Sequence, residues 1–96
     1  MELTPEQKIK LARQFMEAIP HSRHLNMQLT RIDNGVAEIT MPYADMLIGD
    51  PETGVIHGGA VSALMDTCCG AATVSHPMVS GTTATIDLRV DYMRPA

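Results

Sequence analysis

The hydrophobic and polar positions of this chain follow a helical period near the N-terminus. Thr4-Pro5-Glu6 is typical of a helix start, because threonine caps a helix, proline fits its first position and an acid suits its first turn. We therefore expect a helix over residues 4–19, ended by Pro20, with a polar connection at residues 21–24. The side of this helix that we expect to pack against a sheet carries Leu11, Phe15, Ala18 and Ile19.

In later stretches the apolar residues recur at every second position, which is the period of a β-strand. Residues 27–41 alternate on either side of Asp33-Asn34-Gly35, a strong turn signal, and predict a β-hairpin. Residues 43–56 are rich in turn residues and predict a long loop, either functional or a plain connector. Residues 83–94 alternate again and predict one long strand after a loop at residues 80–82. The buried side of that strand would carry Ala84, Ile86, Leu88, Val90 and Tyr92.

A second helix is expected over residues 59–75, after the turn His57-Gly58-Gly59. The stretch lacks proline and is small or apolar nearly throughout, which is typical of a helix enclosed by the rest of its domain. It carries one formal charge, Asp66. A lone carboxylate in such a place either hydrogen-bonds the backbone or Ser62 in the core, or takes part in chemistry. The order helix, hairpin, helix, strand indicates an α+β fold.

The composition narrows the classes of function. Ninety-six residues suffice for one domain, and a net charge of −4 with only three aromatic residues argues against a nucleic-acid partner. The apolar stretch is too short to cross a membrane, and the N-terminus carries no secretory signal. Cys68 and Cys69 are adjacent and cannot easily pair, so reduced cysteines in a cytoplasmic protein are expected. They are expected to be small core residues, and the histidines do not complete a metal site with them.

Three motifs together resemble one known family. The turn His57-Gly58-Gly59 is followed by Asp66 nine residues after the histidine, the stretch 49–56 precedes it, and the stretch 85–96 ends in Asp-Tyr-Met-Arg-Pro-Ala. In these features the chain, over roughly residues 25–96, resembles the hot-dog-fold acyl-CoA thioesterases, most of all the phenylacetate-degradation type.

The resemblance implies a hot-dog fold, in which an antiparallel sheet wraps around a central helix, and subunits that share active sites at a dimer interface. Members of the family usually continue past the Arg-Pro with a further strand hairpin. We therefore expect the fold to be C-terminally incomplete in this chain. No metal or redox cofactor is implied.

The resemblance also assigns roles to individual residues. Asp66 matches the acid that acts as nucleophile or general base, Gly58 the backbone oxyanion donor, and Thr85 the hydroxyl on the following strand. His57 matches the motif histidine and is either structural or a base. Asp50 stands where these enzymes often have asparagine, and an aspartate cannot donate a hydrogen bond unless it is protonated.

Physical chemistry agrees with a thioester site at the start of this helix. The first-turn amides of a helix are unpaired and the helix dipole is positive there, which suits a developing oxyanion. Glycines at Gly58 and Gly59 allow a substrate to approach the backbone closely. Asp66 lies roughly 10 Å or more further along, so a two-fold dimer would have to supply it from the other chain. Met65 either packs in the core or lines an acyl pocket.

The sequence thus predicts an acyl-CoA thioesterase that works as a homo-oligomer, either a dimer or a tetramer. A non-catalytic module that binds acyl-CoA or another acyl ligand is the main alternative. A hot-dog hydratase or dehydratase is a third possibility, although its acid and histidine are usually arranged differently. A cysteine nucleophile paired with histidine lacks an orienting third group. The acyl group itself stays open.

Overall fold

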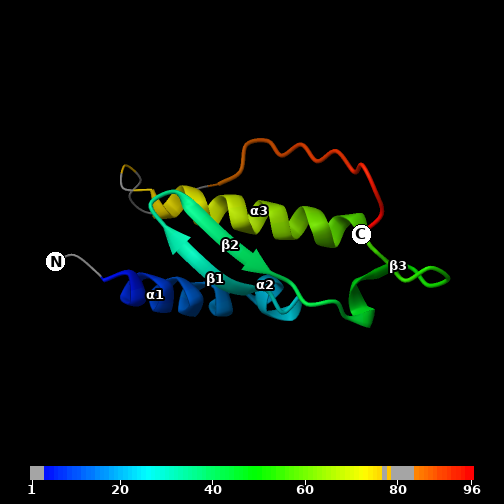
Figure 1. Ribbon diagram of the computed structural model, residues 1–96, viewed down its shortest axis with the longest axis horizontal. Helices are drawn as coiled ribbons and strands as arrows, with labels where there is room; N and C mark the ends of the chain where they lie inside the picture. Colours follow the sequence, from blue (N-terminus) through cyan, green and yellow to red (C-terminus); the bar gives the residue numbers. More distant parts are fainter. Residues whose placement is uncertain (1–3, 77, 79–83) are drawn as a thin grey trace.

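A two-stranded antiparallel hairpin lies between two helices in the computed structural model, which describes residues 4–76, 78 and 84–96 (Figure 1). The helix α1 (Pro5–Ala18) packs against the first strand, and the long helix α3 (Gly58–Ser75) packs against both strands. The core lies where they meet, and Met16 of α1, Met27 and Leu29 are its buried residues. Ala63 and Leu64 of α3 close it from the other side.

The first helix begins as the sequence predicts but presents a different side to the core. Thr4 and Gln7 form a reciprocal capping box, in which each side chain accepts from the other residue's amide. The core side is Ala12 and Met16, four residues apart, whereas the residues predicted to be buried are exposed: Leu11 (51%), Phe15 (63%), Ala18 and Ile19. The apolar arc of α1 is wider than the sheet it meets, so only part of the arc can face β1. The small side chain of Ala12 allows β1 to approach the helix on the side of Ala12 and Met16.

The connection predicted after Pro20 is helical instead. The five residues Pro20–His24 form α2, in which Pro20 occupies the first turn. Proline ends one helix and suits the first position of the next, so the same residue accounts for both the predicted end of α1 and the start of α2.

The predicted hairpin consists of β1 (Gln28–Asp33) and β2 (Val36–Thr40), which pair in an antiparallel register with Asp33 opposite Val36. The two turn residues Asn34 (φ 36°) and Gly35 (φ 92°) both have positive φ, which the Asn-Gly pair tolerates and most other residues do not. The Gly35 amide also donates to Ser75 Oγ at 2.8 Å, which fastens the turn to the end of α3.

The stretch predicted to be a long loop contains a second hairpin. A 3₁₀ turn, η1 (Asp45–Leu47), leads into β3 (Ile48–Asp50), which pairs with β4 (Val55–Ile56). Leu47 is buried, and its carbonyl accepts from the His57 amide at 2.7 Å. The hairpin therefore delivers the chain directly to the start of α3.

The helix α3 begins at Gly58, one residue before the predicted boundary, and ends at Ser75. The hairpin covers one side of it, and none of its residues is buried: Met65 is 38% and Val74 43% exposed. The prediction of a helix enclosed on every side is therefore not met within this chain. A hairpin is too narrow to surround a helix, so most of the small and apolar side chains of α3 remain half-exposed.

The long strand predicted over residues 83–94 is wrong for its described part. Residues 84–96 form neither strand nor helix; they run antiparallel along α3, back towards its N-terminal end (Figure 1, orange to red). Ile86, predicted to be buried, is fully exposed, and the chain bends there. A strand requires a neighbouring strand bonded to it along its length, whereas this segment bonds to α3 through the side chains of Thr85 and Tyr92 and accepts from the Ile56 amide at Ala96. Thr83 and the predicted loop at residues 80–82 lie outside the described residues.

Candidate functional site

The start of α3 presents one backbone amide without a hydrogen-bond partner. His57 is the N-cap residue, and its Nδ1 accepts from the Gly59 amide at 2.8 Å. The Ala60 amide donates to the His57 carbonyl at 3.0 Å. Within the described part of the chain no acceptor pairs with the Gly58 amide. Because the first-turn amides of a helix lack intrahelical partners and carry its positive dipole end, this donor suits a developing oxyanion.

Close packing around His57 explains two of the glycines. A Cβ on Gly49 would lie 2.8 Å from the His57 Cα, and one on Gly59 would lie 2.9 Å from the His57 Nδ1. Both positions therefore exclude a side chain unless the surroundings shift. Gly58 differs, since a Cβ there would meet the Tyr92 ring at an ordinary 3.5 Å. Glycine at position 58 is thus not demanded by packing within the chain.

Asp66 lies on the exposed side of α3 and is hydrogen-bonded to Thr85. The Thr85 hydroxyl donates to one carboxylate oxygen of Asp66 at 2.6 Å, and the Asp66 side chain is half-buried. The structure therefore brings together two of the residues that the family resemblance pairs. It also shows that Asp66 does not use Ser62 as its partner; the Ser62 hydroxyl contacts Tyr92 instead.

Tyr92 is the residue of this region that sequence reasoning did not assign to the site. Its hydroxyl donates to the Gly58 carbonyl at 2.6 Å and also contacts the Ser62 hydroxyl. The alternation of residues 83–94 placed Tyr92 on a buried strand side, away from Thr85. The bend at Ile86 changes the side that later residues present, so both Thr85 and Tyr92 reach α3. The only signal in the sequence was its place in the Asp-Tyr-Met-Arg-Pro motif.

Asp50 has a local role in the second hairpin. Its two carboxylate oxygens accept from the Glu52 amide at 3.0 Å and from the Thr53 hydroxyl at 2.9 Å, and its carbonyl accepts from Gly54. An acceptor-only carboxylate suits this turn well. The structure does not bring Asp50 into contact with Asp66 or Gly58. Met65, predicted to bind substrate, is 38% exposed beside Asp66.

Gly58 and Asp66 face different parts of the surface along one helix. They are eight residues apart, which corresponds to about 12 Å along the axis of an α-helix. A thioester carbonyl needs its oxyanion donor and its attacking group within about 3 Å of the reacting atoms. One chain therefore does not present both groups to a single carbonyl.

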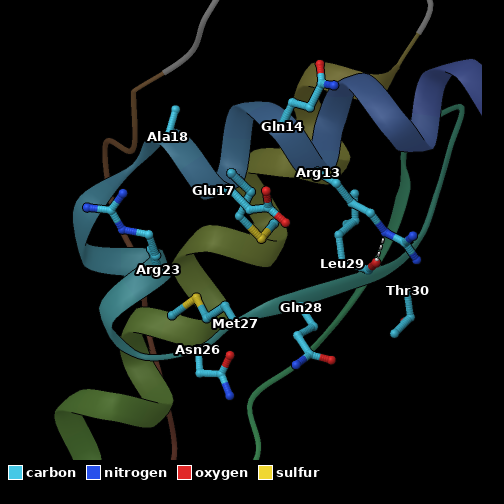
Figure 2. Close-up of a pocket in the computed structure, with 11 residues that line it drawn as sticks. Arg13, Gln14, Glu17, Ala18, Arg23, Asn26, Met27, Gln28, Leu29 and Thr30 are labelled. Carbon is cyan, nitrogen blue, oxygen red and sulfur yellow. Dashed lines mark hydrogen bonds between the residues drawn. The ribbon is translucent and has the colours of Figure 1, made fainter.

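A depression of the described surface lies elsewhere, on the side of α1, α2 and β1 (Figure 2). It has a volume of about 780 Å³, and the Arg13 guanidinium at its rim donates to the Leu29 carbonyl at 2.9 Å. Its lining mixes charged and polar side chains with the apolar core: Arg13, Gln14, Met16, Glu17, Ala18, Arg23, Asn26, Met27, Gln28, Leu29 and Thr30. It does not include the helix start or Asp66.

The two cysteines form no disulfide, and their thiols differ in burial. Burial between α3 and β2 raises the pKa of the Cys68 thiol, which donates to the Ala37 carbonyl at 3.3 Å, whereas Cys69 is exposed. A thiol with a raised pKa is a poor nucleophile, which argues against a cysteine mechanism at Cys68. Among residues 4–76, 78 and 84–96, no three His, Cys, Asp or Glu side chains are grouped closely enough to hold a metal ion. None of the described helices has the length and apolar character needed to cross a membrane.

Comparisons with known proteins identify the family. A family model described as the thioesterase superfamily matches residues 53–96. The medium/long-chain acyl-CoA thioesterase YigI of Escherichia coli K12 is 32% identical over 107 residues, and the match covers 97% of this chain and 69% of that protein. A crystal structure of a Pseudomonas aeruginosa protein is 40% identical, with a TM-score of 0.75. Another crystal structure, of a protein from the thioesterase superfamily, is 26% identical with a TM-score of 0.80.

Each of these two structural matches covers 93% of this chain but 66% of the other, so the chain spans slightly less than two thirds of their length. The α+β fold class and the hot-dog fold predicted from the motifs are confirmed, as is the prediction of an enzyme family of the hydrolase class. The more specific resemblance to the phenylacetate-degradation type stays a prediction. The chain belongs to the thioesterase superfamily.

Proposed function

We propose that this protein is an acyl-CoA thioesterase, which hydrolyses a thioester to a free acid and CoA. The observation that carries the proposal is the Gly58 amide at the start of α3, which has no acceptor among the described residues, together with the Asp66 carboxylate, which accepts from the Thr85 hydroxyl. These are the two elements that thioester hydrolysis requires: a donor for the developing oxyanion and a group that attacks or activates water.

The Gly58 amide would bind the thioester oxygen. As the carbonyl carbon becomes tetrahedral, negative charge gathers on that oxygen, and a donor at the positive end of a helix dipole stabilises it. Glycine at this position allows a close approach to the backbone, and the Tyr92 ring borders the place that a Cβ of Gly58 would take.

Asp66 would act as general base or as nucleophile. As a base it takes a proton from water, the hydroxide oxygen bonds to the carbonyl carbon, and the carbon–sulfur bond breaks to release the CoA thiolate, which then takes up a proton. As a nucleophile its carboxylate oxygen bonds to the carbonyl carbon, and the carbon–sulfur bond breaks to release the CoA thiolate, which takes up a proton. Water then hydrolyses the resulting anhydride to the free acid and restores the carboxylate. In either case the Thr85 hydroxyl holds one oxygen of the carboxylate and leaves the second oxygen for the reaction.

The active site would be shared between subunits of a homo-oligomer, either a dimer or a tetramer. The separation of about 12 Å between Gly58 and Asp66 along α3 supports this arrangement, because a two-fold axis can place Asp66 of one subunit beside Gly58 of another. The half-exposed apolar surface of α3 also supports it, since such surfaces are usually covered in an assembly.

The substrate would be a medium- or long-chain acyl-CoA. The support is the relative YigI, a medium/long-chain acyl-CoA thioesterase, and the exposure of Met65 next to Asp66, where an apolar chain could lie. Free cysteines at positions 68 and 69 support a reducing compartment, and we propose the cytoplasm.

The test is release of free thiol from a panel of acyl-CoA substrates of increasing chain length and an aromatic one, with Asp66→Asn and Asp87→Asn compared. Asp66→Asn should lower kcat by about 10³-fold or more, while Asp87→Asn, which alters an exposed carboxylate of the same segment as Thr85, should leave it unchanged. Calorimetric binding of acyl-CoA without thiol release would support the non-catalytic module instead. Equal turnover by wild type and Asp66→Asn would refute the assigned role.

A further inference from the structure

We propose that Tyr92 is a positioning residue, whose phenol holds the Gly58 carbonyl and thereby restrains the backbone dihedrals of Gly58, on which the direction of its amide depends. This inference rests on the proposed function, because the direction of that amide matters to turnover only if it binds the thioester oxygen. Two observations carry it: the Tyr92 hydroxyl lies 2.6 Å from the Gly58 oxygen, and the Tyr92 ring lies 3.5 Å from the place that a Cβ on Gly58 would take. Residues 34 positions apart are thus joined at the helix start.

The direction of each hydrogen bond among Gly58, Ser62 and Tyr92 follows from which atoms carry a proton. A carbonyl oxygen only accepts, so the single hydroxyl proton of Tyr92 points to Gly58. The contact between Ser62 Oγ and the Tyr92 oxygen therefore requires Ser62 to donate. Ser62 and Gly58 are four residues apart on the same side of α3, so the phenol oxygen bridges the first turn and the second.

The helix start needs such a constraint because its local sequence provides little. Glycine loses more backbone freedom than alanine when it enters a helix, and α3 opens with two glycines in succession. Gly59 is confined by the His57 ring, which accepts from its amide and blocks a Cβ. Gly58 has no side chain, and its amide has no acceptor among the described residues. The Ala60 amide holds the peptide unit before Gly58 through the His57 carbonyl at 3.0 Å, and the phenol of Tyr92 restrains the unit after it.

The geometry keeps Tyr92 out of the substrate's way. In an α-helix the amides point towards the N-terminus and the carbonyls towards the C-terminus. The phenol oxygen bound to the Gly58 carbonyl therefore lies on the C-terminal side of the Gly58 amide, while the Tyr92 ring borders the place that a Cβ of Gly58 would take. Tyr92 does not touch the reacting atoms in this arrangement, and its effect passes through the backbone of Gly58.

The chain offers a matched pair of variants to test this. Both tyrosines donate to a glycine carbonyl: Tyr92 to Gly58, and Tyr43 to Gly54 at 3.0 Å in the second hairpin. They are also similarly exposed, 52% and 59%. Tyr92→Phe and Tyr43→Phe each remove one hydroxyl and keep the ring, so they differ in place and not in chemistry.

We expect Tyr92→Phe to lower kcat on acyl-CoA by about 10- to 100-fold with KM changed less than about three-fold, because a misdirected donor stabilises the transition state less while substrate binding persists. Tyr43→Phe should leave both constants unchanged. An unchanged kcat in Tyr92→Phe, an equal loss in both variants, or a loss explained by a lower melting temperature of Tyr92→Phe would each overturn the inference.

A second measurement does not depend on activity. The NMR order parameter of the Gly58 amide in the substrate-free protein should fall in Tyr92→Phe and stay at its wild-type value in Tyr43→Phe. The Gly70 amide, in the middle of α3, is the internal reference. If wild type released no thiol, the proposed function would fail while the order parameter still tested the positioning. An equal order parameter for Gly58 in wild type and Tyr92→Phe would overturn the positioning whatever the activity.

Discussion

The Nδ1 atom of His57 accepts a hydrogen bond from the Gly59 amide at 2.8 Å, and the preceding amide, that of Gly58, is left without an acceptor in the described chain. A histidine whose Nδ1 accepts carries its ring proton on Nε2. His57 thus caps the helix by taking the second amide of the first turn. The neighbouring amide remains available, so one motif provides both a stable helix start and a free donor.

The Gly58 amide can be removed with little other change. Gly58→Pro deletes the N–H at the first helical position, where proline is well tolerated. The preceding residue His57 has φ −58° and ψ 132°, a conformation that a following proline accepts. We expect kcat on acyl-CoA to fall by about 10²- to 10³-fold, the usual cost of losing an oxyanion donor. The melting temperature should stay close to that of wild type.

Gly58→Ala is the matched control for this variant. It adds a Cβ that meets the Tyr92 ring at an ordinary 3.5 Å and keeps the amide. Its loss of kcat should be much smaller than that of Gly58→Pro. Equal activity of the two variants would mean that the amide of Gly58 is not the oxyanion donor.

The role of His57 can be separated into cap and base. Asparagine is among the best N-cap residues, so His57→Asn should keep the melting temperature near that of wild type, whereas His57→Ala should lose about 1 kcal/mol of unfolding free energy. If His57 only caps, His57→Asn also keeps most of the thiol release. Loss of turnover in a stably folded His57→Asn would show instead that the imidazole acts as a base. Thermal unfolding and steady-state kinetics on the same samples distinguish these results.

The Thr85 hydroxyl is predicted to orient the Asp66 carboxylate through their 2.6 Å hydrogen bond. Valine is similar in shape to threonine, so Thr85→Val removes only the donor. We expect kcat to fall by about 10-fold, less than the roughly 10²-fold that misplacing a reacting group can cost. Thr85→Ser restores a hydroxyl and should recover most of the rate. A Thr85→Ser variant as impaired as Thr85→Val would indicate that packing, and not the hydrogen bond, matters at position 85.

Local signals explain which parts of the fold could be predicted from the sequence. The Asn34-Gly35 turn, the N-cap at Thr4 and the glycine start of α3 each depend on residues close together in the chain, and the structure places all three within one residue of prediction. The prediction of which side of α1 faces the core was wrong, because Leu11, Phe15 and Met16 all lie on one broad apolar arc. Which part of it meets β1 is decided by the position of the sheet, which no local pattern contains.

The same limit applies to the C-terminal segment and the site. Alternation over residues 83–94 predicts which residues share a side only if the strand is straight and paired, and here the chain bends at Ile86 and contacts α3. Asp66 and Thr85 were proposed as site residues from the family motif. The motif contains information on distant positions that the local pattern lacks, and the two side chains are hydrogen-bonded in the structure. Tyr92 was missed because its partner is the carbonyl of Gly58, and the backbone acceptor of a side chain leaves no residue pattern in the sequence.

A site shared between subunits predicts that two inactive variants restore each other. In a dimer of one Gly58→Pro chain and one Asp66→Asn chain, one site combines the intact Asp66 of the first chain with the intact Gly58 of the second, and the other site combines both defects. Differently tagged chains, co-expressed and purified as the mixed dimer, should therefore show about half of the wild-type kcat per dimer. Each variant alone should stay inactive, which would exclude residual turnover of either variant as the source of the mixed dimer's activity. A mixed dimer without activity would place Gly58 and Asp66 in one chain's site, or in no common site. Light scattering on the wild type supplies the complementary check, because a stable monomer with full turnover would contradict a shared site.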